Sequence, residues 1–208
     1  MRALLDALVQ SDPRLAAVEA AAGPLPWRTR PGGFPGLLRI ITAQQISSAA
    51  AAAIWGRLAA VPGALDPDAW PALPDDALRA AGLSRPKVGH GRALAAAFAG
   101  GRLSAAGLAA LPDAEAVAAI TAVPGLGPWT AEVYLLFAEG RADMFPAGDI
   151  AVAGAAAALL GLGVRPDPRA LRSLAEEWRP TRALAARLLW HHWRHLTGRP
   201  SLDDLPMP

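Results

Sequence analysis

A turn rich in proline and glycine, set between two apolar stretches, constrains the fold of this chain most strongly. The segment 123–131 reads VPGLGPWTA and follows a helical pattern over 113–122. Its two glycines, Gly125 and Gly127, permit positive φ and the close approach of another backbone. A proline after the second glycine suits the first turn of a new helix. The segment therefore predicts two helices joined by a tight hairpin, with Leu126 anchoring the turn in the core.

The start of the second predicted helix is suited to binding a phosphate. Backbone N–H groups there point outward, at the positive end of the helix dipole, which favours a phosphate of DNA. The candidate binding residues are Gly125, Leu126, Gly127 and Thr130. A plain connection between two helices has the same Pro-Gly-x-Gly pattern, so the pattern alone leaves that alternative open.

A single acid downstream of the hairpin is the candidate for chemistry. Asp149 ends the sequence FPAGD and precedes an apolar helical run. The simplest interpretation is a helix N-cap, a position that aspartate commonly occupies. A carboxylate beside a helix amino terminus is favoured in its ionised form. The cap and a chemical role are therefore compatible in one residue.

Composition limits the classes of protein to which the chain can belong. Its 208 residues are 53% hydrophobic and 18% charged, which fits one domain, or two small lobes sharing a core, and not wholesale disorder. The chain contains no cysteine, so disulfides, a cysteine nucleophile and a cysteine-ligated iron–sulfur cluster are excluded. Lys87 is the only lysine, which limits the residues able to form a Schiff base.

Basic residues gather in two segments although the formal net charge is only +2. Residues 77–112 hold five basic side chains and no acid, and residues 165–199 hold eight arginines against three acids. Both segments are compatible with a local phosphate-binding face. Solvated helix faces give the same pattern, and charge alone favours this second interpretation over a phosphate-binding face.

Neither the amino terminus nor the apolar runs predict a membrane protein. The amino terminus lacks a signal-peptide core of adequate length, and the apolar run 150–164 is interrupted by glycines. We expect a soluble, cytoplasmic monomer, associated with the nucleoid if the protein is bacterial.

Helical periodicity dominates and no alternating strand pattern is evident, so the sequence predicts an all-α fold. Asp12 is the expected cap of an early helix that has Pro13 in its first turn. A loop is expected over 24–36. The predicted helices cover 37–58, 75–81, 86–99, 105–111, 113–122, 149–160 and 171–196, together with the helix after the hairpin.

The hairpin and the FPAGD segment together resemble the helix-hairpin-helix DNA glycosylases, and within them DNA-3-methyladenine glycosylase II. Further matches are ITAQQIS at 41–47, GLSRPK at 82–87, and Trp178-Arg179-Pro180 leading to Trp190. The resemblance runs from about residue 12 to residue 193. It implies two helical lobes with the active site in the cleft between them. Lobe A covers about 33–142 with the hairpin at 123–129, and lobe B about 1–32 plus 143–200. The β-rich amino-terminal domain of some members is not expected.

The resemblance also assigns roles to residues. It makes Asp149 the catalytic aspartate, whose charge would stabilise an oxocarbenium-like sugar and orient or deprotonate water. An indole face suits a cationic alkylated base, and the implied base pocket consists of Trp129, Trp190, Trp27 and Ile150. Core packing is the alternative for each tryptophan. Ile150 stands where one branch of the family has tyrosine, which leaves the base preference open.

Other motif residues correspond to the family's contacts with DNA. Gln45, next to Gln44, matches the wedge that fills the gap left by a flipped base, and a solvated polar pair is the alternative. Ser84 and Lys87 lie in the GLSRPK match and are further DNA-binding candidates.

Two expectations concern cofactors and the reaction's outcome. Trp129 stands where bifunctional relatives carry a lysine, so we expect a monofunctional glycosylase that leaves the abasic site uncut. The hairpin motif resembles one that binds K⁺ or Na⁺ through backbone carbonyls, here those of Thr121, Val123 and Leu126. No other cofactor is expected.

The expected partner is double-stranded DNA with alkylated bases of the 3-methyladenine type. One alternative is a non-catalytic helix-hairpin-helix module that only binds DNA. Another is an alanine-rich helical interaction domain with no nucleic-acid partner. The sequence does not rank 3-methyladenine against 7-methylguanine, hypoxanthine or ethenoadenine.

Overall fold

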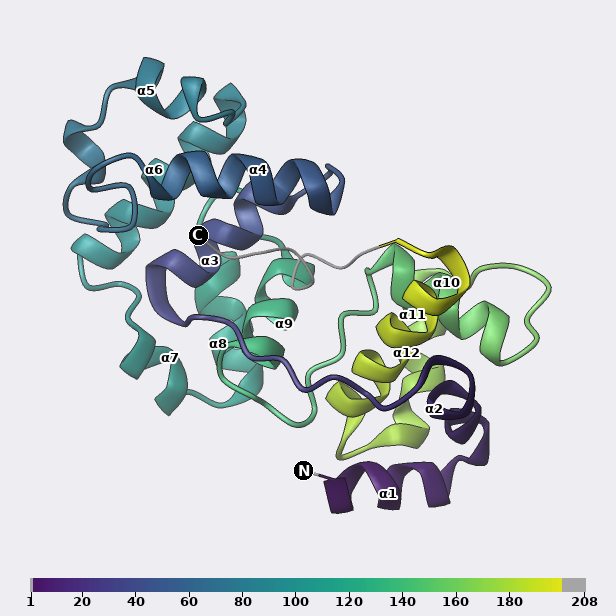
Figure 1. The fold of residues 1–208 in the computed structure, drawn as a ribbon. Helices are drawn as coiled ribbons and strands as arrows, with labels where there is room; N and C mark the ends of the chain where they lie inside the picture. Colours follow the sequence, from purple (N-terminus) through teal and green to yellow (C-terminus); the bar gives the residue numbers. More distant parts are fainter. Residues whose placement is uncertain (1, 200–208) are drawn as a thin grey trace. The chain divides into compact units, whose positions relative to one another are not determined.

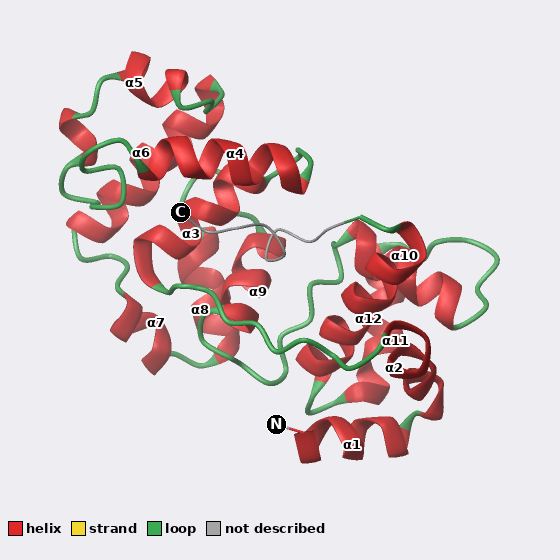
Figure 2. Cartoon of the chain, viewed as in Figure 1, coloured by secondary structure: helices red, strands yellow, loops and turns green. Residues whose placement is uncertain are grey.

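The computed structural model describes residues 2–199, and this part of the chain contains twelve α-helices and no β-strand (Figures 1 and 2). The all-α prediction is therefore confirmed. The helices are α1 Arg2–Ser11, α2 Ala16–Ala22, α3 Gly33–Ala43, α4 Ser48–Ala59, α5 Asp75–Ala80, α6 Arg85–Ala99, α7 Ala105–Ala110, α8 Asp113–Thr121, α9 Pro128–Phe137, α10 Ile150–Leu159, α11 Pro168–Leu174 and α12 Arg182–Thr197. Short 3₁₀ turns cover Pro13–Leu15, Trp70–Ala72 and Ala175–Trp178. None of the described helices is long and apolar enough to cross a membrane.

The chain divides into two compact units. Residues 30–134 form the first, which we call the hairpin unit because it contains the turn between α8 and α9. Residues 2–29 and 135–199 form the second, which we call the aspartate unit because it contains Asp149.

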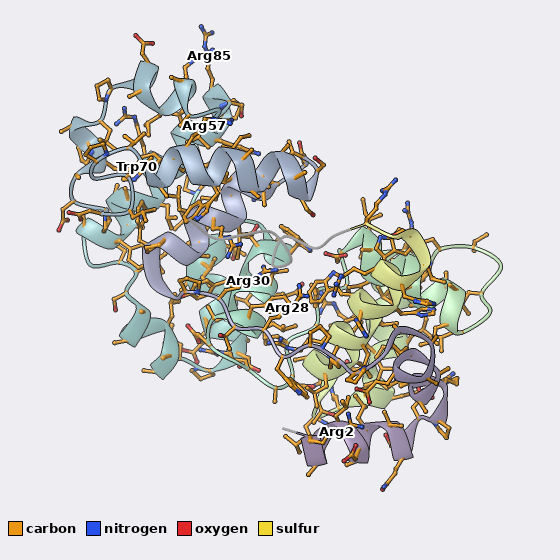
Figure 3. All side chains as sticks on the ribbon, viewed as in Figure 1. Arg2, Arg28, Arg30, Arg57, Trp70 and Arg85 are labelled. Carbon is orange, nitrogen blue, oxygen red and sulfur yellow. The ribbon has the colours of Figure 1, made fainter. Side chains whose placement is uncertain are left out.

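The hairpin unit is built on α3, which packs against α4 and α6, and the buried Trp70 contacts both α3 and α6 (Figure 3). Its ring is fully buried and its Nε1 donates to the carbonyl of Ala64 at 2.7 Å. The ring of Phe34 meets it edge-on, with centroids 5.9 Å apart. A Cβ at Gly91 would lie 2.4 Å from the Trp70 ring, so only glycine lets α6 approach it this closely.

The aspartate unit is built on α12, which packs against α10 and α2. Small residues make this possible: Ala153, Ala155 and Ala156 of α10 are buried. A Cβ at Gly154 would lie 2.4 Å from the ring of Trp193. The alanine-rich sequence of α10 is therefore a close-packing surface, which positions the amino terminus of this helix.

The prediction of one helix over 37–58 was wrong. The helix α3 begins earlier, at Gly33 inside the expected loop, and ends at Ala43, while α4 begins at Ser48. Between them Gln45 adopts the left-handed region with φ of 59°. Ser47 then caps α4 by accepting from the amide of Ala50 at 3.3 Å. The helical pattern of apolar residues continues through this break and conceals it.

The prediction of one helix over 171–196 was also wrong. The helix α11 ends at Leu174, and α12 begins only at Arg182, after Pro180. Proline has no N–H to donate and cannot continue a helix. The carboxylate of Asp143 marks the new start, because it accepts from the backbone N–H of Arg182 at 3.4 Å and from its guanidinium at 2.9 Å.

The expected cap at Asp12 is confirmed, and this residue also ties the amino-terminal segment to the rest of the aspartate unit. Its carboxylate accepts from the backbone N–H of Arg14 at 3.1 Å and from Nε1 of Trp178 at 2.8 Å. The guanidinium of Arg14 binds it with two further bonds, at 2.7 and 2.8 Å. Asp12 is only 6% exposed. The hydrogen bonds from Arg14, aided by the one from Trp178, lower the pKa of this carboxyl against the opposing effect of burial.

We therefore expect Asp12→Asn to lower the free energy of unfolding near pH 7 by about 1.5–3 kcal/mol, since the bonds to an ionised acceptor are lost. A lowered folded-state pKa stabilises the protein above the unfolded pKa of about 3.9, and this contribution is lost as the pH falls through the folded value. Urea unfolding at pH 7 and at pH 3 measures the difference between wild type and variant. We expect this difference to be smaller at pH 3 than at pH 7, and a constant difference would show that the charge of Asp12 does not contribute.

Candidate functional site

The predicted hairpin between α8 and α9 is present. The amide of Leu126 donates to the carbonyl of Val123 at 3.1 Å and closes the turn. The amide of Ala131 donates to the carbonyl of Gly127 at 3.1 Å and begins the ladder of α9. Leu126 is 3% exposed, so it anchors the turn in the core as the sequence predicts. The residues around it are exposed, which leaves the start of α9 accessible.

The two hairpin glycines differ in what they do. Gly125 has φ of 88°, and a Cβ there would lie 2.2 Å from the ring of His90. Gly127 is not among the residues with positive φ, so the expectation of positive φ holds for Gly125 only. A Cβ at Gly127 would meet no atom within 4 Å. The fold therefore requires glycine at 125, whereas Gly127 faces open space that another molecule can approach.

The four residues Gln44–Ser47, which we call the wedge turn, lie against this hairpin. Nε2 of Gln44 donates to the carbonyl of Gly125 at 3.3 Å and to the hydroxyl of Thr130 at 3.1 Å. Gln45 is exposed beside it, and the neighbouring Ile46 is 39% exposed. The structure thus brings Gln44 to Gly125 and Thr130, two candidates of the hairpin that lie 81 and 86 residues further along the chain.

Lys87 supports the same turn from α6. Its ammonium donates to the carbonyl of Thr42 at 2.7 Å and to that of Gln44 at 2.9 Å. Burial lowers the pKa of this ammonium. Ser84 is exposed and serves as the N-cap of α6, with its hydroxyl accepting from the amide of Lys87 at 3.4 Å.

Asp149 is the N-cap of α10, as the sequence predicts. Its Oδ1 accepts from the amides of Ala151 and Val152, at 2.8 and 3.0 Å. Its own amide donates to the carbonyl of Pro146 at 2.9 Å. The side chain is 9% exposed. These bonds hold one carboxylate in a fixed orientation at the positive end of the α10 dipole.

The proposed base-pocket residues belong to both units. Trp129 lies half-buried in the first turn of α9, in the hairpin unit. In the aspartate unit, Trp27 is 44% exposed and Ile150, the first residue of α10, is 65% exposed. Trp190 is half-buried on α12, with its ring centroid 5.3 Å from that of Phe137.

Arg187 packs against Phe137, the ring partner of Trp190 in the aspartate unit, and was not among the sequence candidates. Its guanidinium lies over the Phe137 ring, 4.5 Å from the centroid. It donates to the carbonyl of Arg28 at 2.8 Å and to that of Leu136 at 3.2 Å (Figure 3 labels Arg28). It thereby fixes the backbone next to Trp27. Its position three residues before Trp190 could have indicated this role in the sequence, because residues three apart on a helix share a face.

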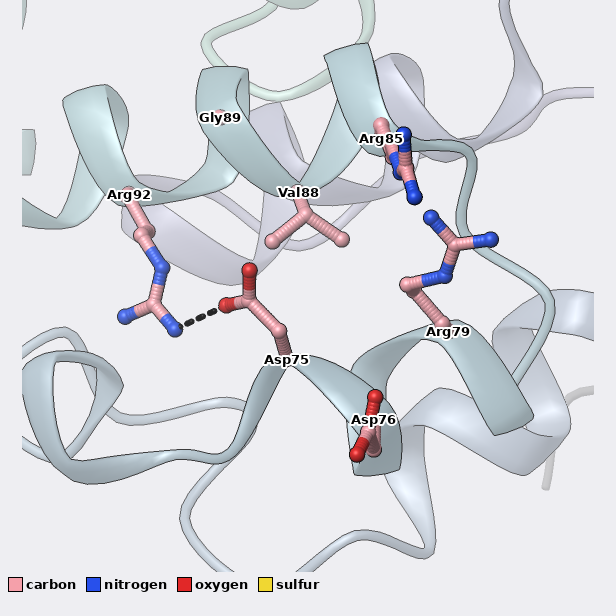
Figure 4. A pocket seen from close by; sticks show the side chains of 7 residues that line it. All are labelled: Asp75, Asp76, Arg79, Arg85, Val88, Gly89 and Arg92. Atoms are coloured by element: carbon pink, nitrogen blue, oxygen red, sulfur yellow. Dashed lines mark hydrogen bonds and ion pairs between the residues drawn. The ribbon is translucent and has the colours of Figure 1, made fainter.

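Part of the basic segment 77–112 lines a groove between α5 and α6 (Figure 4). Arg92 supports the fold there, since it pairs with Asp75 and donates to the carbonyls of Trp70 and Leu73 at 2.9 and 2.8 Å. Arg79 and Arg85 extend toward each other across the groove. The segment is therefore divided between the structural Arg92 and the exposed Arg79 and Arg85.

Residues 2–199 form an all-helical fold with a Gly-x-Gly hairpin and an aspartate that caps a later helix, as expected from the sequence's resemblance to the helix-hairpin-helix glycosylases. Comparison with known families agrees: residues 38–180 match the model of the HhH-GPD superfamily base excision DNA repair proteins. The chain belongs to this superfamily.

Individual relatives point to one group within it. A probable bifunctional transcriptional activator and DNA repair enzyme, AlkA of Mycobacterium tuberculosis, is 33% identical over 217 residues, covering 93% of this chain and 42% of the relative. The crystal structure of a DNA-3-methyladenine glycosidase from Bacillus halodurans is 31% identical, with a TM-score of 0.77, covering 95% of this chain and 92% of that one.

A third comparison supports the fold alone. The Schizosaccharomyces pombe 3-methyladenine DNA glycosylase Mag1, in complex with abasic DNA, has a TM-score of 0.80 at 23% identity, covering 89% of this chain and 95% of that one. The chain spans less than half the length of the Mycobacterium relative.

Proposed function

We propose that this protein is a monofunctional base-excision-repair glycosylase that removes alkylated bases of the 3-methyladenine type from duplex DNA. The observation that carries the proposal is the carboxylate of Asp149, buried and held by two amides at the start of α10, in a chain of this superfamily. The similarity to DNA-3-methyladenine glycosidases supports the choice of substrate.

In this proposal the hairpin binds the DNA backbone. The amides at the start of α9 carry the partial positive charge of the helix dipole and donate to a phosphate. Gly127 leaves the space that the phosphate needs, because no side chain lies within 4 Å of where its Cβ would be. These contacts position the duplex without reading its sequence.

Gln45 then serves as the wedge. Flipping a nucleotide unstacks it and leaves a gap in the duplex. Gln45 is exposed on the wedge turn, next to the half-exposed Ile46, so it is free to enter such a gap. The flipped base would stack on an indole, for which Trp190 and Trp129 are the candidates, and a cationic base favours the negative face of such a ring.

Asp149 acts on the sugar. When the bond between C1′ and the base nitrogen breaks, the bonding electron pair leaves with the base, and positive charge develops on the sugar ring. The fixed carboxylate stabilises that charge. Water then forms a bond to C1′ and gives up a proton, which Asp149 accepts. A base that is cationic before cleavage leaves as a neutral molecule, so one carboxylate suffices.

The proposal includes no cleavage of the strand. Cleavage through a Schiff base needs a free amine, and the chain's only lysine holds two backbone carbonyls with its ammonium. We expect no protein–DNA adduct on borohydride treatment and no strand scission before alkali. A trapped adduct on sodium dodecyl sulfate gels would contradict the monofunctional assignment.

Base release is the test of the function. Purified protein is incubated with methylated duplex DNA, and the released bases are separated and identified by mass spectrometry. The proposal predicts free 3-methyladenine. DNA binding without release would favour the non-catalytic module, and no binding would favour an interaction domain without a nucleic-acid partner.

We further propose a K⁺ or Na⁺ ion at the hairpin, bound by the carbonyls of Thr121, Val123 and Leu126. Neutral carbonyl oxygens are a ligand type that suits alkali cations. The Val123 carbonyl already accepts one hydrogen bond, from Leu126, and a carbonyl oxygen has a second lone pair. When bound, the ion would add positive charge where the phosphate docks. Replacing K⁺ by tetramethylammonium at equal ionic strength should weaken DNA binding, and unchanged affinity would argue against the ion.

A further inference from the structure

We propose that Lys87 and Gln44 are positioning residues that hold the wedge turn in its active shape and join it to the hairpin. The inference rests on the proposed function, because it concerns how Gln45 enters DNA. It assigns the chain's only lysine to the support of the protein's own backbone and not to a phosphate.

The wedge turn needs such support because its backbone is held in an unfavourable shape. Gln45 has φ of 59°, a region that side-chain-bearing residues seldom adopt without a compensating contact. The turn follows directly on the end of α3, where carbonyls lack partners within the helix. Lys87 supplies the missing donor: its ammonium donates to the carbonyl of Thr42 at 2.7 Å and to that of Gln44 at 2.9 Å. The second of these carbonyls belongs to the residue directly before Gln45.

Gln44 provides the second connection. Its amide nitrogen reaches the carbonyl of Gly125 at 3.3 Å and the hydroxyl of Thr130 at 3.1 Å, one on each side of the phosphate-binding start of α9. The residue before the wedge is thus bound to the hairpin by its side chain and to α6 by its backbone. Movement of the wedge turn relative to the hairpin would break these bonds.

One face of α6 supports both elements. Lys87 donates to the wedge turn at the carbonyl of Gln44. The ring of His90, three residues later, lies against the hairpin, where a Cβ at Gly125 would come within 2.2 Å of it. Residues three apart share a helix face. The helix therefore sets the spacing between the wedge and the hairpin, and phosphate binding places Gln45 at a fixed point in the base stack.

This role differs measurably from a phosphate contact. An ammonium has three donors, and two of those of Lys87 are used within the protein. Loss of a phosphate contact reduces the slope of log K against log salt by about one. Loss of Lys87 should leave that slope unchanged and should instead reduce the preference for DNA that has a gap to fill.

The test measures the affinity of each variant for a duplex with a tetrahydrofuran abasic site and for the intact duplex. We expect Lys87→Met to lower the preference for the abasic duplex about tenfold and Lys87→Arg, which can still donate to both carbonyls, to retain most of it. In a Gln45→Ala background, Lys87→Met should cause no further loss, because a positioning residue acts through the residue it positions. Arg2→Met removes one positive charge from an exposed position outside both basic segments and serves as the control, which should keep the wild-type preference.

Additive losses from Lys87→Met and Gln45→Ala, or a reduced salt slope, would overturn the inference. Hydrogen exchange of the free protein adds a readout without DNA: amides of the wedge turn should exchange about tenfold faster in Lys87→Met. If Lys87→Met does not fold, Gln44→Met breaks only the connection to the hairpin and should give the same loss of preference. A wild type that prefers abasic DNA but releases no base would refute the proposed function and leave the positioning role intact.

Discussion

Asp149→Asn is expected to lower the single-turnover rate constant of base release by about 100-fold or more, while DNA affinity and the free energy of unfolding stay close to wild type. Asparagine is as good an N-cap as aspartate, so the bonds from Ala151 and Val152 to Oδ1 can persist. What is lost is the negative charge beside the developing positive charge of the sugar. Removing one preorganised electrostatic contact of this kind commonly reduces rates by about 10²–10³.

The chain offers a matched control for this change. Asp167 is the N-cap of α11 and accepts from the amide of Ala170 at 2.8 Å. Asp167→Asn makes the same chemical change at a helix cap without a proposed catalytic role, and it should release base at the wild-type rate. Equal rates for Asp149→Asn and Asp167→Asn would show that Asp149 is only a structural cap.

Gly127→Ala is expected to weaken binding to intact duplex DNA about tenfold without changing stability, because its methyl group would fill space that the phosphate needs. Gly125→Ala should instead lower the stability of the protein and leave its DNA affinity close to wild type. It imposes a left-handed φ on alanine and a clash with His90, so the free energy of unfolding should fall by about 1–3 kcal/mol. Fluorescence anisotropy with labelled duplex measures affinity, and urea unfolding measures stability.

Gly127→Ala and Gly125→Ala together distinguish a role of the hairpin in DNA binding from a role in folding. If Gly127→Ala binds DNA as tightly as wild type, the phosphate does not dock where the proposal places it. If Gly127→Ala instead unfolds more easily, the added methyl group meets the protein itself and the space at this position is not open.

Features with local signals were predictable from the sequence. The hairpin follows from its glycines and prolines, and the caps at Asp12 and Asp149 follow from an acid before a helical run. In each case the determining contacts join residues within about four positions of each other. The all-α class followed from periodicity for the same reason.

Features that depend on distant contacts were not predictable. The break at Gln45 has no glycine or proline to mark it, and it is held by Lys87 from α6 and by a bond from Gln44 to the hairpin. Arg187 gains its place only when Arg28 and Leu136 are folded beside it. The break before α12 is different, since Pro180 is a local signal for it and the apolar pattern continues on both sides of this proline.

In the proposed mechanism the hairpin binds DNA and Asp149 acts in base release, so changes at these two sites should affect different measured quantities. Affinity and single-turnover base release are measured for Gly127→Ala and Asp149→Asn on the same methylated duplex. We expect Gly127→Ala to lose affinity but to reach the wild-type rate at saturating protein, whereas Asp149→Asn should keep its affinity and lose the rate. If both variants lost only affinity or only the rate, or if Asp149→Asn released base at the wild-type rate, this division of roles would be contradicted.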